Sequence, residues 1–198
     1  MNLLLDELPD RVEIGGADYP IHTDFRTAIQ FELMMLDSSI PEEEKAGIAL
    51  NLFFDDWPED LESAVEAILA FYQCGREPKR GRRGGKSVKR CYSFEYDSGY
   101  IYAAFLEQYG IDLTEVKMHW WKFKALFESL SPDMMFVKIM GWRSAVIDGK
   151  IPPAEKKRLR ELKEYYALPV QRTDDDKADA IYAVLMGDGD LRGLLAEE

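Results

Sequence analysis

The sequence predicts a mainly α-helical, bundle-like protein with a small N-terminal β-hairpin and one flexible basic loop. Apolar residues recur every three or four positions along most of the chain, and capping or helix-breaking residues bound these stretches. The 198-residue length and the 46% hydrophobic content suffice for a packed core. We therefore expect one helical domain over residues 1–168, interrupted by the mobile loop 76–90, and a C-terminal helical extension over residues 169–198 that docks loosely or frays.

The first element is predicted from a turn sequence between two short apolar stretches. Residues 15–18, Gly-Gly-Ala-Asp, favour a tight turn because glycine readily adopts positive φ. Val12 and Ile14 precede this turn, and Tyr19 and Ile21 follow it. The alternation predicts a two-stranded β-hairpin.

Three helices are predicted between the hairpin and the basic loop. Thr23 or Asp24 caps the first, Pro41 and three following glutamates form the first turn of the second, and Pro58 precedes the third, which ends at Gly75. The expected buried stripes are Phe25, Ile29, Leu33 and Leu36 in the first helix, Ile48, Ala49, Leu52 and Phe53 in the second, and Leu61, Val65, Ile68, Leu69 and Tyr72 in the third.

Five helices are predicted after the basic loop. The first begins near Ser98 and is broken by Gly110, and the second and strongest begins at Asp112 or Thr114. The expected apolar faces are Ile101, Phe105, Leu106 and Tyr109 in the first, and Val116, Trp120, Phe123, Phe127 and Leu130 in the second. Further helices are expected around residues 132–145, 153–166 and 174–186.

The basic loop carries a charge opposite to that of the rest of the chain. Residues 75–90 contain 8 Lys/Arg and 1 Asp/Glu, whereas residues 1–74 contain 3 and 17, and residues 91–198 contain 14 and 19. An electrostatic contact with an acidic partner or with another copy of the chain is one role for these cations, and a flexible connector that touches nothing is the alternative. The candidate contact residues are Lys79, Arg80, Arg82, Arg83, Lys86, Lys89 and Arg90. The acidic remainder of the chain and the lack of interleaved aromatic residues disfavour nucleic-acid binding.

No pattern in the sequence predicts catalysis, a cofactor or a metal site. The two histidines, His22 and His119, lie far apart and outside metal-binding motifs. Cys74 and Cys91 are expected to be free thiols, as in a reducing cytosol. No GxSxG motif occurs, and no apolar run approaches the roughly 20 residues of a membrane span. We therefore expect a non-enzymatic cytoplasmic protein that binds no membrane.

Aromatic side chains are the candidates for contact with a protein partner. These candidates are Trp120, Trp121, Phe123 and Trp142. The helical spacing of Trp120 and Phe123 also fits burial in the core. Trp121 lies beside this stripe, where it either widens the buried face or is exposed to a partner.

Several segments of the chain carry a resemblance to a known family. The likeness is clearest in GYIYAAFLEQYGIDL at residues 99–113 and HWWKFKALFESL at residues 119–130. It extends to NLLLDELP, YPIHTDFR, FYQCG, KIMGWR and YYALP, so that it spans about residues 2–169 in the same order of segments. By these segments the chain resembles the bacteriophage gene-product-fifteen family, with a basic insertion after FYQCG.

This resemblance implies a protein of phage and prophage tail-morphogenesis gene clusters, encoded near the tape-measure protein and made in the host bacterial cytoplasm. Such proteins are expected to be tail assembly chaperones, which hold the long helical tape measure soluble until tail-tube protein polymerises around it. The expected partners are the tape-measure protein, the tail-tube protein and other copies of the chain. The alternative is a structural tail-completion subunit that stays in the virion. The family implies no catalytic residues.

Overall fold

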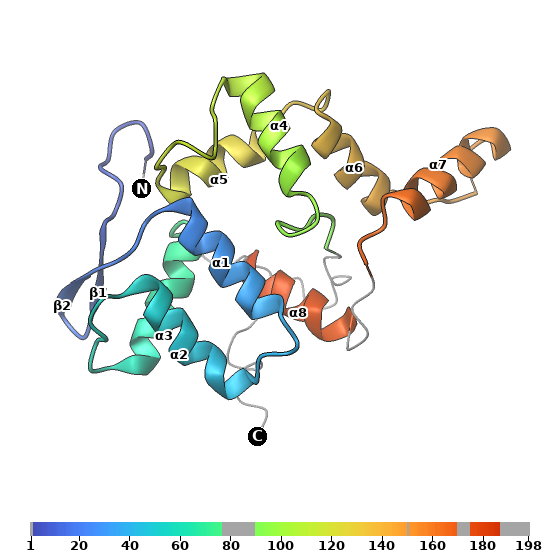
Figure 1. Ribbon diagram of the computed structural model, residues 1–198. Coiled ribbons are helices and arrows are strands. Elements are labelled where there is room, and N and C mark those ends of the chain that lie inside the picture. Colours follow the sequence, from blue (N-terminus) through green and yellow to red (C-terminus); the bar gives the residue numbers. More distant parts are fainter. Residues whose placement is uncertain (1, 77–89, 150, 170–174, 187–198) are drawn as a thin grey trace. The chain divides into compact units, whose positions relative to one another are not determined.

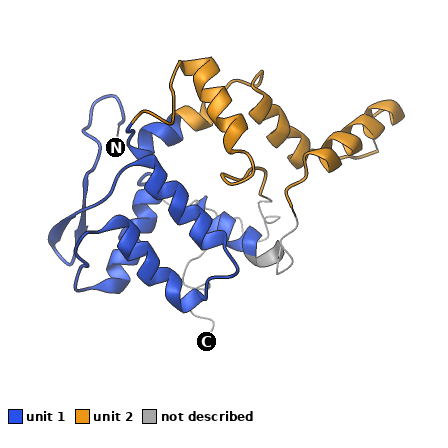
Figure 2. Ribbon diagram, viewed as in Figure 1, with its two compact units in different colours: residues 1–88, 117–125, 173–198 blue, residues 89–116, 126–172 orange. Residues whose placement is uncertain are grey.

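The computed structural model describes residues 2–76, 90–149, 151–169 and 175–186, and in these residues the protein is mainly helical (Figure 1). Eight α-helices and one two-stranded sheet occur in this part, which confirms the predicted fold class. The chain divides into two compact units (Figure 2). Unit 1 comprises residues 1–88, 117–125 and 173–198, and unit 2 comprises residues 89–116 and 126–172. The loop residues 77–89 lie outside the described residues, and the domain limit at residue 168 stays a prediction.

The N-terminal hairpin of unit 1 forms as its turn sequence predicts. Strands β1 (Arg11–Ile14) and β2 (Ala17–Pro20) pair antiparallel, with Val12 opposite Tyr19. Gly15 and Gly16 have φ values of 60° and 82°, a conformation that costs glycine little. The hairpin packs against α3 through β1.

Four helices belong to unit 1 in full: α1 (Phe25–Leu36), α2 (Glu42–Phe53), α3 (Leu61–Tyr72) and α8 (Asp175–Leu185). Asp24 caps α1 by accepting from the Arg26 amide, and Asp60 caps α3 by accepting from the Ser63 amide. Unpaired amides at a helix start need such acceptors. Of the two predicted caps of α1, the structure selects Asp24 rather than Thr23.

The predicted stripe of α1 is wrong in part. Ile29 and Leu33 are only half-buried, whereas Phe31, Glu32 and Met34 are buried. Helix α1 packs against both α2 and α8, so it buries a wider surface than a single stripe provides. The same correction applies to the other predicted stripes, in which Ile48, Leu52 and Val65 are half-buried and Leu61 and Leu106 are exposed.

Unit 2 contains three complete helices: α4 (Ser98–Tyr109), α6 (Met135–Ser144) and α7 (Pro153–Tyr165). Gly110 ends α4 in the left-handed conformation, with φ 66°, as predicted. Helix α6 packs against α4 and α7. Helix α7 has no buried residue, which sets it apart from the other helices of this unit.

Helix α5 (Trp120–Glu128) is much shorter than the sequence predicts. Its expected start at Asp112 or Thr114 is wrong because backbone groups of residues 118 and 120 bond to another part of the chain. The Met118 carbonyl accepts from the Phe25 amide at 2.9 Å, and the Trp120 amide donates to the Thr23 carbonyl at 2.7 Å. These bonds hold the chain extended at residue 119, so the helix begins only after it.

Helix α8 is the described part of the C-terminal extension. Ile181, Tyr182, Val184 and Leu185 are buried, and α8 packs against α1. The side-chain amide of Gln73 also donates to the Val184 carbonyl at 2.8 Å. The apolar face of the predicted extension is therefore placed in unit 1. Within the described residues, no helix is long and apolar enough to cross a membrane.

Candidate functional site

Two neighbouring tryptophans close the C-terminal end of α3. The indole nitrogen of Trp120 donates to the Tyr72 carbonyl at 2.7 Å, and that of Trp121 donates to the Phe71 carbonyl at 2.8 Å. The last carbonyls of a helix have no partner within the helix, and their burial without one is costly. The tandem tryptophans therefore fix the end of α3 against the start of α5.

Beyond this helix end the chain turns through two residues in the left-handed conformation. Cys74 has a φ of 60° and Gly75 a φ of 64°. A Cβ atom added at Gly75 would lie 3.2 Å from the Cη2 atom of Trp121. Glycine suits this position because it adopts this backbone conformation readily and leaves room for the close approach of the indole.

A pocket of ≈ 190 Å³ lies beside this turn. Its lining residues are Leu3, Cys74, Gly75, Arg76, Trp121 and Ala125. A cavity of roughly 150 Å³ can hold a benzene ring, so the pocket has about the volume of one aromatic ring. The pocket thus lies next to the end of α3.

An apolar ridge continues from the wall of this pocket. Leu3, Leu4 and Leu5 are 51%, 92% and 82% exposed. The amides of Leu5 and Asp6 donate to the Asn2 carbonyl at 3.0 and 2.9 Å, so these leucines lie on an ordered turn. Three consecutive exposed leucines form an apolar surface patch, and such patches are common at interaction sites.

The predicted binding residues of unit 1 are packed differently from one another. Trp120 and Phe123 are 0% exposed, with Trp120 stacked on Tyr72 and Phe123 stacked on Phe25. In this conformation neither offers surface to a partner. Trp121 is also mostly buried but lines the pocket.

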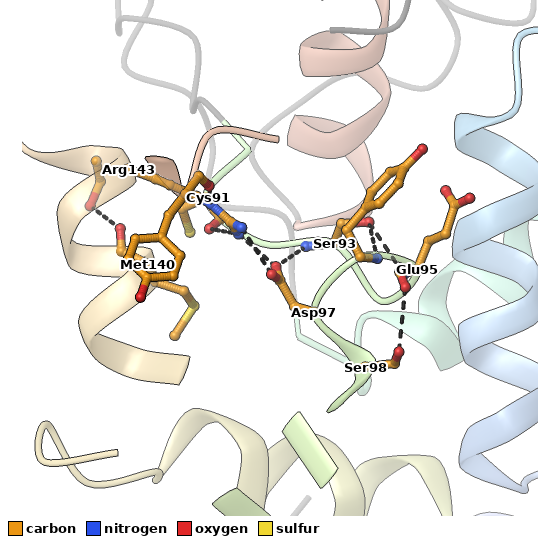
Figure 3. Close-up of polar contacts among 10 residues, drawn as sticks. Cys91, Ser93, Glu95, Asp97, Ser98, Met140 and Arg143 are labelled. Atoms are coloured by element: carbon orange, nitrogen blue, oxygen red, sulfur yellow. Dashed lines mark hydrogen bonds and ion pairs between the residues drawn. The ribbon is translucent and has the colours of Figure 1, made fainter. Parts of the chain in front are cut away.

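In unit 2, Arg143 of α6 connects three segments of the chain (Figure 3). Its guanidinium makes two bonds to the Asp97 carboxylate, at 2.6 and 2.9 Å, and donates to the Cys91 carbonyl at 3.1 Å. Its Nε atom donates to the Tyr166 carbonyl at 2.6 Å. Asp97 is 1% exposed and also accepts from the Ser93 amide. A buried carboxylate needs such complete pairing.

Aromatic rings gather where Arg143 holds the end of α7. Trp142 stacks on Tyr166 with a centroid distance of 5.1 Å, and Tyr165 meets Tyr166 edge to face at 4.8 Å. Burial is the main cause that raises the pKa of Tyr166, and the nearby Tyr100 and Tyr165 raise it further. Tyr165 is 78% exposed, so the cluster presents one ring to solvent. Of the predicted binding residues, Trp142 therefore lies in an aromatic cluster that is partly exposed.

Two polar residues of unit 1, the half-buried His119 and the buried Tyr72, are hydrogen-bonded within the unit. The Nδ1 atom of His119 accepts from the Trp121 amide at 3.0 Å, so its Nε2 atom carries the proton and donates to the Pro9 carbonyl. Burial lowers the pKa of His119. The Tyr72 hydroxyl donates to the Glu32 carboxylate. Burial is the main cause that raises the pKa of Tyr72, and the neighbouring carboxylate raises it further.

Other predicted site features lie partly outside the described residues. Of the predicted contact residues in the basic loop, Arg90 is described and is half-buried. The others lie outside the described residues: Lys79, Arg80, Arg82, Arg83, Lys86 and Lys89. Among the described residues, no group of three or more histidine, cysteine or acidic side chains is arranged to hold a metal ion. Cys74 and Cys91 are free thiols, as expected.

A family model described as Bacteriophage Gp15 protein matches residues 4–168. The chain belongs to this bacteriophage family. The match confirms the resemblance seen in the sequence segments and makes the chain a phage-related protein. No curated protein and no solved structure matches the chain.

Several of the segments that resemble the Gp15 family contact one another, either around the tandem tryptophans of unit 1 or around Arg143 of unit 2. FYQCG supplies the carbonyls that bind the tryptophans of HWWKFK, and YPIHTDFR supplies the backbone partners of residues 118 and 120. KIMGWR supplies Arg143 and Trp142, which hold Tyr166 of YYALP. These motifs thus correspond to packing contacts within each unit.

Proposed function

We propose that this protein is a non-enzymatic tail assembly chaperone of a phage or prophage, acting in the host cytoplasm. Its partner is the tape-measure protein, which it holds soluble until tail-tube protein assembles. Membership of the Gp15 family is the observation that carries this proposal. The proposed role rests on the tail-morphogenesis setting that the resemblance implies.

The surface of unit 1 supports this proposal physically. A long amphipathic helix needs its apolar stripe covered to stay soluble, and a groove or ridge with anchor pockets is a common way to cover one. Leu4 and Leu5 expose most of their area, and the adjoining pocket has about the volume of one aromatic ring. We assign the tape-measure contact to the leucine ridge and the pocket wall at Trp121.

Co-expression with the tape-measure protein of the same gene cluster tests the proposal. A soluble complex that survives size-exclusion chromatography is the expected result. Replacing Leu3, Leu4 and Leu5 by serine should remove the complex, whereas replacing the exposed Leu106 and Val146 of unit 2 by serine should leave it intact. A tape measure that is equally soluble without this protein would contradict the proposal.

The structural tail-completion subunit is the second candidate, since the same family membership accommodates it. Mass spectrometry of purified virions separates the two functions. A chaperone should be absent from the particle, and a completion subunit should be present at a fixed copy number.

A further inference from the structure

Helix α8 covers a surface of unit 1 with one apolar face. It packs against α1, and both helices belong to unit 1 (Figure 1). Its buried side chains include the apolar residues Ile181, Tyr182, Val184 and Leu185. Together with the half-buried Ala178, these positions follow the spacing i, i+3, i+4, i+6 and i+7. Amphipathic helices that bind in apolar grooves use this kind of spacing for their anchor residues.

Two polar side chains of unit 1 meet the C-terminal end of α8. The side-chain amide of Gln73 donates to the Val184 carbonyl at 2.8 Å, and the Lys124 ammonium donates to the Met186 sulfur at 3.7 Å. Lys124 is 8% exposed. The last carbonyls of a helix need donors from outside it, and a cation is favourable near its negative end. The α8 surface, formed by α1, Gln73 and Lys124, therefore accepts a helix in one direction.

The α8 surface and the helix that covers it differ in their relation to the family. All residues of the surface lie within residues 4–168, which match the Gp15 family, whereas α8 lies outside the match. Helix α8 has 11 residues, and isolated helices shorter than about 12–15 residues are marginal in water. Its docking therefore carries the cost of ordering the segment. A longer helix that is already formed binds without this cost.

We infer that the α8 surface binds an amphipathic helix of the tape-measure protein, and that α8 occupies this surface in the free protein. The inference rests on the proposed chaperone function and adds a second contact to the leucine ridge. The α8 of a second copy is identical to the resident helix and lacks the advantage of belonging to the same chain, so it does not displace it. Because α8 and the partner compete, the partner's apparent affinity is scaled by the fraction of chains in which α8 is undocked.

Ala180 allows α8 to be weakened without any change to the surface beneath it. Ala180 lies within α8 and is exposed. Ala180→Pro removes a backbone hydrogen bond and clashes with the preceding turn, which breaks a helix. Ala180→Gly weakens the helix less, and it gives the same comparison at smaller amplitude if the proline variant does not fold. Ala180→Gln is the matched control, because glutamine is a good helix former.

The first measurement follows the fluorescence anisotropy of a labelled peptide with the sequence of residues 175–186, added to the full chain. We expect it to bind the Ala180→Pro variant at least about tenfold more tightly than the natural chain or the Ala180→Gln variant. A peptide with Ile181→Ser and Leu185→Ser should not bind. Adding Gln73→Ala to the proline variant should weaken binding, since it removes the donor to the Val184 carbonyl. Equal affinity of the natural and proline chains, or binding to neither, would overturn the inference.

The second measurement uses the tape-measure protein of the same gene cluster, diluted from denaturant into buffer that contains each full chain. The Ala180→Pro variant should keep it soluble at about tenfold lower concentration than the natural chain does, and excess unlabelled peptide should cancel this gain. Equal recovery with both chains would overturn the inference and leave the chaperone proposal intact. Recovery with neither would contradict the chaperone proposal and, with it, the assigned partner. Dimers of the natural chain that the peptide dissociates would make a second copy the occupant and would also overturn the inference.

Discussion

The indole nitrogen of Trp120 donates a hydrogen bond of 2.7 Å to the carbonyl oxygen of Tyr72, 48 residues earlier in the chain. The ring also stacks on Tyr72 with a centroid distance of 5.1 Å. One side chain thus satisfies a buried carbonyl and fills the core beside it. Because Trp120 is 0% exposed, water cannot replace this bond.

Replacing Trp120 by phenylalanine should lower the free energy of unfolding by about 2–4 kcal/mol. The change removes the donor to the Tyr72 carbonyl and leaves a cavity where the larger ring was. Chemical denaturation measures the effect. Trp57 is the matched control, since its indole donates to Asn51 at the surface, and its replacement by phenylalanine should cost less than about 0.5 kcal/mol. Equal losses in the two variants would contradict the role given to Trp120.

Replacing Gly75 by alanine should destabilise the protein more than the same change at Gly110. Both glycines have φ values in the left-handed region, 64° and 66°, so each substitution costs about 1 kcal/mol in backbone strain. Only at Gly75 does the new Cβ meet a neighbour, the Trp121 ring at 3.2 Å. The difference in unfolding free energy between the two variants isolates this contact. Equal losses in the two variants would show that the indole moves aside.

Replacing Asp97 by alanine should cost about 3–5 kcal/mol, because it leaves the mostly buried Arg143 guanidinium without its carboxylate. The surface pair Lys157 and Glu161 is the control, and replacing Glu161 by alanine should change stability by less than about 1 kcal/mol. Replacing Arg143 by lysine should also destabilise, since an ammonium cannot make the paired bonds to Asp97. A loss of less than about 1 kcal/mol in the Asp97 variant would refute this account of unit 2.

Stability should fall as the pH drops below about 6.5 because of His119. Burial lowers the pKa of His119 in the folded protein. As the pH falls, the unfolded chain therefore takes up this proton at a higher pH than the folded protein does. The folding stability that is present above about pH 6.5 is then lost as the pH falls through the folded pKa. Protonation of Nδ1 also removes the acceptor of the Trp121 amide. A variant with His22 replaced by glutamine isolates the effect, since His119 is then the remaining histidine. Unfolding free energies between about pH 6.5 and 5 should fall in this variant and stay flatter when His119 is also replaced by glutamine.

Local sequence signals predicted the helices but not the contacts between them. Asp24, Gly110 and the hairpin glycines act within a few residues, so their effects are readable in sequence. The late start of α5 could not be predicted, because the bonds that delay it join residues 118 and 120 to residues 25 and 23. Tertiary hydrogen bonds there override a helical apolar pattern that starts at Val116.

The candidate site was predictable only in part. The sequence identified Trp121 and Trp142 as aromatic residues of interest, but periodicity did not separate them from the buried Trp120 and Phe123. The leucine ridge was visible as three adjacent apolar residues before Asp6, yet its exposure depends on the turn at Asn2. Nothing in the sequence paired Asp97 with Arg143, which lie 46 residues apart.

The most direct test of the chaperone proposal uses purified proteins. Tape-measure protein is diluted from denaturant into buffer with increasing amounts of this protein, and the tape measure left in the supernatant is quantified. We expect recovery to rise with the amount of added protein and to saturate at a fixed ratio, and the variant with serine at Leu3, Leu4 and Leu5 to give none of this recovery. Equal precipitation with and without the natural protein would contradict the proposed function.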